Sequence, residues 1–409
     1  MNDIPKHWQI KKLGEVCVTT SGGTPNRGNS KFYQGNIPWV KSGELDRGLI
    51  LDTEEKISEE AIKNSSAKIF PKGTLLIALY GATIGKLAFL GIDAATNQAV
   101  CGIYKNENID SNYLFNFLFY KKASLVKQGI GGAQPNISQG ILKNLDIPIP
   151  PFKEQQAIVA KIEELLSELE NGKQQLLTAQ QQLKVYRQSL LKWAFEGKLT
   201  NKYVKAGELP KGWKLKELKE ITSVLGDGLH GTPKYSENGD YYFINGNNLN
   251  DGKIEIKENT KRVSLEEFNK YKKPLNENTI FVSINGSLGY TAFYNNENVV
   301  LGKSACYFNV LETINKFYIR YFLTSSRFNS YANKNATGST IKNVGLKTMR
   351  ELQIPIPATI EEQQLIVAEL ESKLTVCDKI EETISQSLQQ AESLRQSILK
   401  QAFEGKLIK

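Results

Sequence analysis

The sequence predicts an α+β protein built from two globular modules and two long helical segments. Residues 191–199 return at 399–407 with a single change, 208 positions later in a chain of 409 residues. Apolar residues recur every seven positions through 162–190, which is typical of long helices that pack along one seam. Elsewhere, short apolar runs alternate with Gly, Asn and Pro, as in strands and turns. The order globular, helical, globular, helical therefore indicates an internal repeat.

The first module covers residues 1–150, and we expect its sheets to be mostly antiparallel. The apolar run 74–80 predicts a strand, and Gly81, Ala82 and Thr83 predict the turn after it. Residues 58–63 and 112–122 predict two helices. We expect this module to fold as one α+β domain.

The first helical segment covers residues 151–200. One row of seam positions holds Ile162, Leu169, Leu176, Leu183 and Leu190, and the interleaved row holds Leu165, Gly172, Ala179, Tyr186 and Trp193. Pro150 and Pro151 suit the entry, because proline is tolerated in a first helical turn. Gly197 follows the last apolar residue, where a left-handed cap ends a helix.

The second module covers residues 201–357 and matches the first through short anchors. Residues 209–213 repeat the pattern of 4–8, residues 231–233 repeat 23–25, and residues 354–357 repeat 147–150. The run 279–284 predicts a strand, and residues 315–327 predict a helix. Because the residues between the anchors differ, we predict one scaffold that carries two different surfaces.

The second helical segment covers residues 358–409 and ends at Gly405, as the first ends at Gly197. Its seam is weaker and includes Leu370, Cys377, Ile384, Ala391 and Ile398. Two such helices in one chain meet at high effective concentration, so we predict an antiparallel intramolecular coiled coil with a pseudo-two-fold repeat. The alternative is that the helices mediate oligomerisation with another copy.

The composition favours a cytoplasmic protein with a polyanionic partner. The four cysteines lack a CxxC spacing, and the chain holds only two histidines, so a zinc site or a disulfide scaffold is not expected. The net charge is +9, and the excess lies on the modules, with +4 on 1–150 and +7 on 201–357. Double-stranded DNA attracts such charge. An ordinary basic surface explains the charge alone equally well.

Polar and basic residues gather in the predicted turns of both modules. Arg, Lys, Asn and Gln read base edges, and Lys, Ser and Thr also bind phosphates. Each one taken singly is an ordinary turn residue, and the set is what favours DNA. The candidate DNA-binding residues are Thr24, Arg27, Lys41, Ser42, Lys86, Gln134, Asn136, His230, Thr232, Lys234, Asn245, Asn247, Asn285, Ser287, Lys303, Thr340 and Lys342.

No catalytic constellation appears in the sequence. Gly302, Lys303 and Ser304 resemble the end of a phosphate loop, but position 297 is Glu297 and the glycine cradle is missing. Asp240 with Glu255 and Lys257 mimics a nuclease metal site, and the first module does not reproduce that spacing. The chain is therefore predicted to bind without catalysing.

Taken together, these motifs resemble the DNA-specificity subunit of Type I restriction–modification systems, over essentially the whole chain. The resemblance is carried by the openings 5–8 and 210–213, by 147–151 leading to 154–156, by 354–357 leading to 362–364, by 134–138, and by the endings 194–199 and 402–407. It implies that each module is a target recognition domain that reads one half of an asymmetric, bipartite site.

The resemblance also implies the partners and cofactors. The helices set the spacer between the half-sites and dock two modification subunits, which bring S-adenosylmethionine and methylate adenine. Restriction subunits that use ATP and Mg then join, and this chain itself binds no cofactor. The expected partner-binding residues are Glu154, Gln155, Phe195, Glu362, Gln363 and Phe403.

The chain departs from the family pattern in one place, and two rival functions stay open. After Gly338 the second module has residues 339–343 where the first has Gln134, Pro135 and Asn136, so residue roles transfer poorly there. One rival is a coiled-coil scaffold for protein partners that reads no DNA. The other is a self-contained nuclease or methyltransferase that depends on Glu255.

Overall fold

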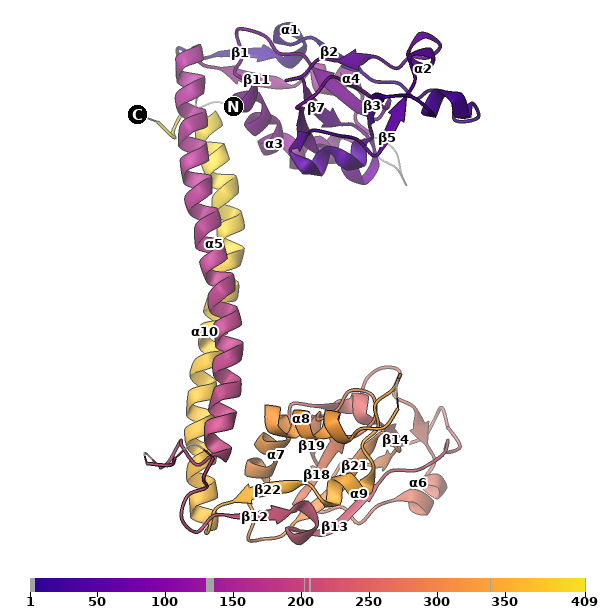
Figure 1. The fold of residues 1–409 in the computed structure, drawn as a ribbon, viewed down its shortest axis with the longest axis vertical. Coiled ribbons are helices and arrows are strands. Elements are labelled where there is room, and N and C mark those ends of the chain that lie inside the picture. The colour runs from indigo at the N-terminus through magenta and orange to yellow at the C-terminus, as the bar shows by residue number, and fades with distance from the viewer. Residues whose placement is uncertain (1–3, 130–135, 202, 206, 339, 409) are drawn as a thin grey trace. The chain divides into compact units, whose positions relative to one another are not determined.

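A computed structural model describes residues 4–129, 136–201, 203–205, 207–338 and 340–408 (Figure 1). The chain divides into two compact units. Unit 1 holds residues 1–176 and 386–409, and unit 2 holds residues 177–385. The division cuts both long helices, so each unit combines one globular module with one end of each helix. The predicted segments separate each module from its helix, whereas this division groups each module with parts of both helices. The predicted segments are 1–150, 151–200, 201–357 and 358–409.

Among its described residues, the globular module of unit 1 contains three sheets. A two-stranded sheet pairs the start of the module with its end, with Gln9 opposite Ile149 and Lys12 opposite Asp146. Of the strand pairs described in this unit, only β4·β8 and β3·β9 are parallel. The sheets are β1(Gln9–Lys12)–β11(Asp146–Ile149); β2(Thr19–Ser21)–β10(Val100–Ile103)–β7(Leu75–Ala78)–β8(Leu87–Leu90)–β4(Leu49–Ile50); and β5(Glu55–Ile57)–β3(Ile37–Val40)–β9(Ala94–Thr96)–β6(Ile69–Phe70).

Several helices of unit 1 begin at a residue whose side chain caps the first turn. α3 (Ser111–Gln128) starts at Asp110, whose carboxylate accepts hydrogen bonds from two backbone N–H groups of the first turn. It is longer than the predicted 112–122. The shorter helices are α1(Leu13–Val16), α2(Glu59–Lys63) and α4(Gln139–Lys143), with 3-10 turns η1(Ser30–Tyr33), η2(Ser42–Arg47) and η3(Gly81–Thr83).

Unit 2 repeats this scheme with its own strands. Lys214 pairs with Ile356, as Gln9 pairs with Ile149 in unit 1. Among the described strand pairs of this unit, only β14·β20 is parallel. The sheets are β12(Lys214–Glu217)–β22(Gln353–Ile356); β13(Thr222–Asp227)–β21(Ala305–Val310)–β18(Thr279–Ser283)–β19(Thr291–Phe293); β17(Arg262–Val263)–β14(Tyr241–Ile244)–β20(Val299–Leu301); and β15(Leu249–Asn250)–β16(Lys253–Ile254).

The single helix predicted at 315–327 is two helices. α7 (Lys316–Thr324) ends at Ser325, whose backbone is extended, and the Ser325 hydroxyl caps α8 (Ser326–Asn335). Serine is common at this position because its side-chain oxygen accepts a hydrogen bond from a backbone N–H of the first helical turn, which has no partner within the helix. The remaining helical elements of the module are α6(Leu265–Tyr271), α9(Leu346–Arg350), η4(Leu218–Glu220) and η5(Gly246–Asn248).

The long helices are α5 (Phe152–Phe195) and α10 (Ile360–Phe403), each of 44 residues. Within unit 1, the beginning of α5 and the end of α10 share one apolar core through Ile158, Ile162 and Leu399. Within unit 2, the end of α5 and the beginning of α10 share another, through Leu190 and Leu370. In both units the two helices therefore meet with opposite chain directions.

The two predicted seam rows are buried to different degrees. Leu183, Leu190, Leu370 and Cys377 are buried, whereas Tyr186 of the interleaved row is 43% exposed. Trp193, Ile380 and Leu394 are exposed as well. Within unit 2, Arg187 of α5 also pairs with two carboxylates of α10, Asp378 at 2.6 Å and Glu381 at 3.1 Å.

Both long helices end in the same glycine cap. Gly197 and Gly405 have φ of 74° and 70°, as the sequence predicted. At the first helix end, Lys198 N–H donates to the Trp193 carbonyl at 2.8 Å, and Gly197 N–H donates to the Ala194 carbonyl at 3.2 Å. This pair of bonds is the Schellman motif, which satisfies carbonyls that a helix end leaves open.

Over the part of the chain that the structure describes, no helix is both long and apolar enough to cross a bilayer.

Candidate nucleic-acid interface

The basic residues predicted in unit 1 form ion pairs with carboxylates. Arg27 Nη1 lies 2.5 Å from Glu55 Oε2, and Lys41 Nζ lies 3.1 Å from Glu55 Oε1. Lys41 also contacts Glu54 at 2.9 Å. The hydrogen bond from Arg27, followed by that from Lys41, holds the pKa of Glu55 below its usual value. The structure thus brings Arg27 and Lys41 together, with their charge partly neutralised by one shared carboxylate.

Arg27 also stacks on aromatic rings. Its guanidinium lies 4.4 Å from the ring centre of Tyr33 and 4.9 Å from that of Trp39. A guanidinium held over aromatic faces keeps its edge for hydrogen bonds. This placement presents a cation at the surface in a fixed direction, and no sequence spacing could have predicted it.

The other predicted residues of unit 1 are less closely grouped. Lys86 forms an ion pair with Asp46 of η2, and Lys41 precedes the same turn as its N-cap. Ser42 opens η2, whereas the Thr24 hydroxyl bonds to Gln98. Asn136 is exposed and bridges to Tyr80 through its backbone, while Gln134 lies outside the described residues.

In unit 2, four predicted residues line one cavity of about 660 Å³. They come from the turn after β14 and from the loop after β18, which the fold brings to one place. Lys257 and Tyr290, which the prediction did not include, also line it. The four are Asn245, Asn247, Asn285 and Ser287.

The turn after β14 is held rigidly by its neighbours. The Asn248 Oδ1 accepts from Asn245 N–H at 3.0 Å, and its Nδ2 donates to the Glu255 carbonyl at 2.9 Å. Gly246 N–H donates to Ser304 Oγ at 2.8 Å. A side chain at Gly246 would meet Ser283 Cβ at 2.9 Å, so glycine is needed for this close approach. The cavity therefore has a well-fixed wall.

The remaining predicted residues of unit 2 lie outside that cavity. His230 pairs with Asp227, and Lys342 Nζ donates to Asn333 Oδ1 at 2.5 Å. Lys234 N–H donates to the buried Glu267. Thr232, Lys303 and Thr340 are exposed.

The rival metal site has little geometric support. Glu255 Oε1 accepts from Asn250 Nδ2 at 2.5 Å, so its carboxylate is already engaged. Within the described ranges, no group of three or more His, Cys, Asp or Glu is placed to hold a metal ion.

The expected partner-binding glutamines lie inside their units. The Gln155 Oε1 accepts from Asp110 N–H at 2.8 Å, and the Gln155 Nε2 donates to the Pro150 carbonyl at 2.9 Å. Gln363 Oε1 accepts from Asn315 N–H at 2.8 Å in the same way. Both glutamines are fully buried, so they join the long helices to the modules instead of facing a partner.

The neighbouring glutamates hold the tryptophans that open each module. Trp8 Nε1 donates to Glu154 Oε1 at 2.9 Å, and Trp213 Nε1 donates to Glu362 Oε1 at 2.9 Å. In unit 1, His7 Nε2 also lies 2.9 Å from Glu154. The repeated Trp and Glu-Gln motifs of the sequence are thus two ends of one brace in each unit.

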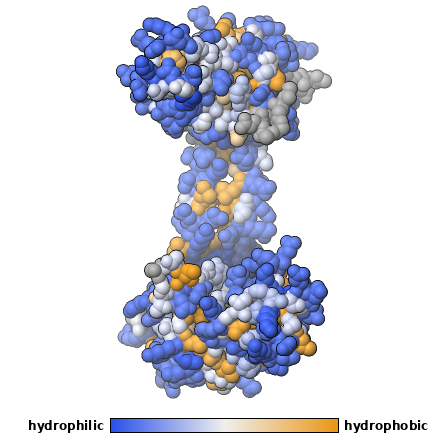
Figure 2. Space-filling view, turned by 90° about the vertical axis from the view of Figure 1, so that its right-hand side faces the viewer, coloured by the Kyte–Doolittle hydropathy of each residue, from blue (hydrophilic) through white to orange (hydrophobic). Residues whose placement is uncertain are grey.

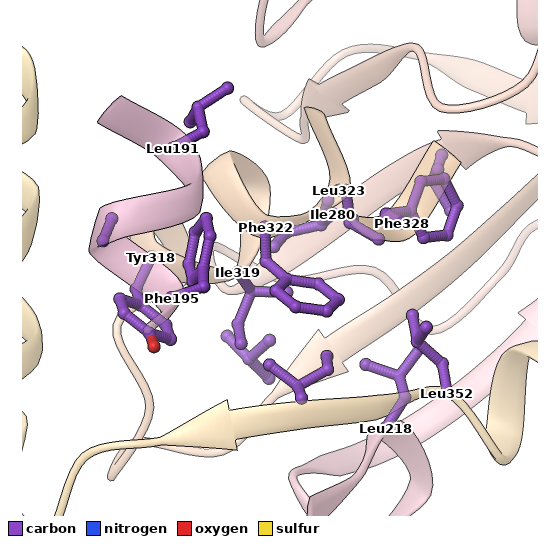
Figure 3. Packing of buried hydrophobic residues seen from close by; sticks show 14 of the residues in the cluster. Leu191, Phe195, Leu218, Ile280, Tyr318, Ile319, Phe322, Leu323, Phe328 and Leu352 are labelled. Atoms are coloured by element: carbon purple, nitrogen blue, oxygen red, sulfur yellow. The ribbon is translucent and has the colours of Figure 1, made fainter. Parts of the chain in front are cut away.

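The two phenylalanines expected to bind partners are buried as well. Figure 3 shows Phe195 beside Tyr318 and Phe322. The Phe195 ring centre lies 5.1 Å from those of Tyr318 and Phe322 in edge-to-face contacts. Phe403 packs against Tyr113 at 5.3 Å and Phe117 at 5.2 Å. Each helix therefore ends in an aromatic plug, and the expectation of a direct partner contact does not fit this burial.

Sequence reasoning missed an exposed apolar surface on the helices. Figure 2 shows apolar atoms gathered along the helical stretch. In unit 2 the exposed large side chains of α5 and α10 include Tyr186, Trp193, Val376 and Ile380, which we call the apolar flank. The heptad spacing picked out Tyr186 and Trp193 as surface-burying residues, but it placed them in the seam between the helices, whereas both are exposed.

The comparison with protein families gives one result that covers most of the chain. The model of the Type I restriction modification DNA specificity domain matches residues 5–179 and again residues 210–390. The two matches fall on the two halves of the repeat.

Curated relatives agree with this result. The Type I restriction enzyme MjaIX specificity subunit of Methanocaldococcus jannaschii is 31% identical over 232 residues, which cover 54% of this chain and 53% of that protein. The matches to the first two relatives span about half the length of each. The EcoKI specificity subunit of Escherichia coli is 25% identical over 99% of this chain and 90% of its own length.

Solved structures share the fold. A chain from a study of complex assembly and conformational transition of the type I R-M system aligns with a TM-score of 0.72 at 20% identity, over 98% of this chain and 99% of its own. The HsdS subunit from Thermoanaerobacter tengcongensis aligns with a TM-score of 0.62 at 20% identity, over 98% of each chain.

Proposed function

Because the chain belongs to the family of Type I restriction modification DNA specificity domains, with one family domain in each half, we propose that it is the DNA-specificity subunit of a Type I restriction–modification enzyme. The resemblance seen in the sequence is thereby confirmed. The observation that carries the proposal is the tandem match over 5–179 and 210–390. Two reading domains in one chain suit a target made of two unlike half-sites.

Each module reads one half-site and contributes no chemical step. The net charge of +9 favours DNA, and basic turns follow the phosphates with an affinity that falls as salt rises. Polar turn residues then distinguish bases in the grooves. In the first module these residues lie around Arg27 and Lys41. In the second they line the cavity that holds Asn245, Asn247, Asn285 and Ser287.

The long helices form an antiparallel coiled coil that sets the distance between the half-sites. The opposite chain directions of α5 and α10 within each unit support this arrangement. The matching Trp8–Glu154 and Trp213–Glu362 braces support a pseudo-two-fold relation between the modules. A helix of 44 residues is about 66 Å long at 1.5 Å per residue, enough to span a spacer on the order of one DNA turn, ~34 Å.

The partners are two modification subunits that carry S-adenosylmethionine and methylate adenine, and restriction subunits that use ATP and Mg. The apolar flank supports a protein partner on the helices, since exposed apolar patches mark such surfaces. We place the complex in the cytoplasm, which suits four free, buried thiols.

The test is long-read sequencing of methylated adenines in the source cell, with and without the gene. We expect one split, asymmetric motif to disappear on deletion. An unchanged methylome in a cell whose methyltransferase is active would favour the scaffold rival and contradict this proposal.

Two variants separate the modules from the helices. Replacing residues 1–150 with those of a relative is expected to change one half-site only. Adding whole heptads to both α5 and α10 is expected to lengthen the spacer and leave both half-sites unchanged, because the added turns touch no reading residue. A change in half-site bases would refute the role of the helices as a ruler.

A further inference from the structure

Asparagine dominates the lining of the cavity in unit 2. Asn245, Asn247, Asn250 and Asn285 all line it, together with Glu255. Amide side chains offer one donor and one acceptor side by side. In the major groove, adenine presents the complementary pair, the N7 acceptor and the N6 amino donor.

Three of the four asparagines already use one end of their amide within the chain. Asn245 Oδ1 accepts from Ser304 Oγ at 3.0 Å, and Asn250 Nδ2 donates to Glu255 at 2.5 Å. Asn285 Nδ2 donates to Asn343 Oδ1 at 3.2 Å. These side chains build the wall of the cavity.

Asn247 differs from the other three. Its side chain is exposed, and across the described part of the chain neither end of its amide has a hydrogen-bond partner. Its backbone is nevertheless held in place, because Lys257 Nζ donates to the Asn247 carbonyl at 2.6 Å. The residues on either side, Gly246 and Asn248, also form hydrogen bonds. The result is a free amide on a rigid turn, which costs little entropy to bind.

The charges around the cavity favour a base edge over a phosphate. The Glu255 carboxylate lies in the same wall and repels phosphate oxygens. Guanine presents two acceptors, N7 and O6, and so suits Arg or Lys, whereas the Lys257 ammonium is engaged by the Asn247 carbonyl. A neutral amide with both ends free matches adenine.

The corresponding turn of the first module lacks this group. There, Lys41 N–H donates to Glu44 Oε2 at 2.8 Å, as Asn245 N–H donates to Asn248 Oδ1 in unit 2. Both turns follow the strand that pairs in parallel with its neighbour, β3 or β14. At the position of Asn247 the first module has Gly43, so only the second module carries an amide there.

From this arrangement we infer that Asn247 reads an adenine in the half-site of the second module, with Oδ1 accepting from the N6 amino group and Nδ2 donating to N7. This inference rests on the proposed function and adds one specified base and the residue that specifies it.

The first experiment compares methylomes written by the full complex that carries wild-type chain, Asn247→Ala or Asn298→Ala. Asn298 is an exposed asparagine of the same module outside the cavity, and serves as the matched control. Asn247→Ala is expected to make one adenine position of one half-site degenerate, and Asn298→Ala to leave the motif unchanged. No split motif with wild-type chain would refute the proposed function. An intact wild-type motif that Asn247→Ala leaves unaltered would refute only this inference.

The second experiment tests the atoms involved. Duplexes that carry the motif, with 7-deazaadenine at one adenine at a time, lack the N7 acceptor. Wild-type complex is expected to bind one of these duplexes on the order of ten- to a hundred-fold more weakly, while Asn247→Ala loses nothing further at that position. If Asn247→Ala fails to assemble, Asn247→Asp, which keeps the side-chain shape, takes its place. Equal losses in wild-type and variant complexes at every adenine would overturn the inference.

Discussion

Replacing Phe403 with alanine is expected to weaken the contact between the end of α10 and helix α3 of the first module. The ring is buried and contacts Tyr113, Phe117 and Tyr120, with ring centres 5.2 to 5.6 Å apart. Truncating a buried phenylalanine costs about 3–5 kcal/mol through lost burial and the cavity left behind. Because Phe403 joins α10 to α3, that cost falls on the contact between helix and module.

Hydrogen exchange measured by mass spectrometry reports how well the backbone amides of each segment are protected. It suits this chain because the two units need not unfold together. A loss of about 3–5 kcal/mol is expected to speed exchange in α3 (Ser111–Gln128) by roughly a hundred- to several-thousand-fold, since 1.4 kcal/mol is tenfold. Exchange in α7 (Lys316–Thr324) is expected to stay unchanged. Phe195→Ala is expected to give the reverse pattern, because Phe195 packs on Tyr318 and Phe322 of α7.

Phe152→Ala provides the control, since Phe152 is the first residue of α5 and is 41% exposed. Its loss is expected to cost about 1 kcal/mol or less. Unchanged protection of α3 in Phe403→Ala, or equal opening of both units by Phe195→Ala and Phe403→Ala, would contradict a local role for these rings.

Three further predictions follow from local geometry. Gly405→Ala is expected to lower the melting temperature of unit 1, because φ of 70° costs a side chain about 1–2 kcal/mol and the new Cβ would meet a proline 2.3 Å away; an unchanged melting curve would contradict this. Glu55→Gln is expected to tighten DNA binding at low salt and to steepen its salt dependence, because it removes the carboxylate charge that Arg27 and Lys41 share and leaves Lys41 paired with Glu54; binding titrations that show no change in slope would place Arg27 off the DNA. Burial raises the pKa of Cys17 to about 11 and that of Cys101 to about 12, so native thiols are expected to resist alkylation at pH 8 and to react on denaturation. Because these folded-state pKa values lie above the ordinary thiol pKa of 9.0, the stability they contribute is present below pH 9 and is lost between about pH 9 and 12; denaturant midpoints that stay constant across that window would argue against the burial.

Local features of the chain were predictable where neighbouring residues determine them. The glycine caps follow from a helical pattern that stops at Gly197 and Gly405, and both adopt the left-handed conformation. The break at Ser325 was missed, although serine within a predicted helix is a recognised cap. The repeat and the family resemblance were visible because whole motifs recur.

Features that depend on distant residues were not predictable. Glu154 and Trp8 belong to two repeated motifs, but only the fold shows that they bond to each other. The neutralisation of Arg27 by Glu55 arises from the pairing of separate strands and turns. Gln155 and Phe403 were expected at a partner surface from the family resemblance, whereas both are buried where a long helix meets its module.

The position of Phe403 also has a consequence for the order in which the chain folds during its synthesis. Unit 2 is one continuous stretch, 177–385, and is complete before the last residues are made. Unit 1 lacks the ring of Phe403 until that residue is made. Nearly 290 residues are added between Phe117 and Phe403, which contact each other in the folded unit. At about 5–20 residues per second that delay is roughly 15–60 s. The first module is therefore finished after the second, and a chain whose synthesis stops before residue 403 carries an incomplete first module.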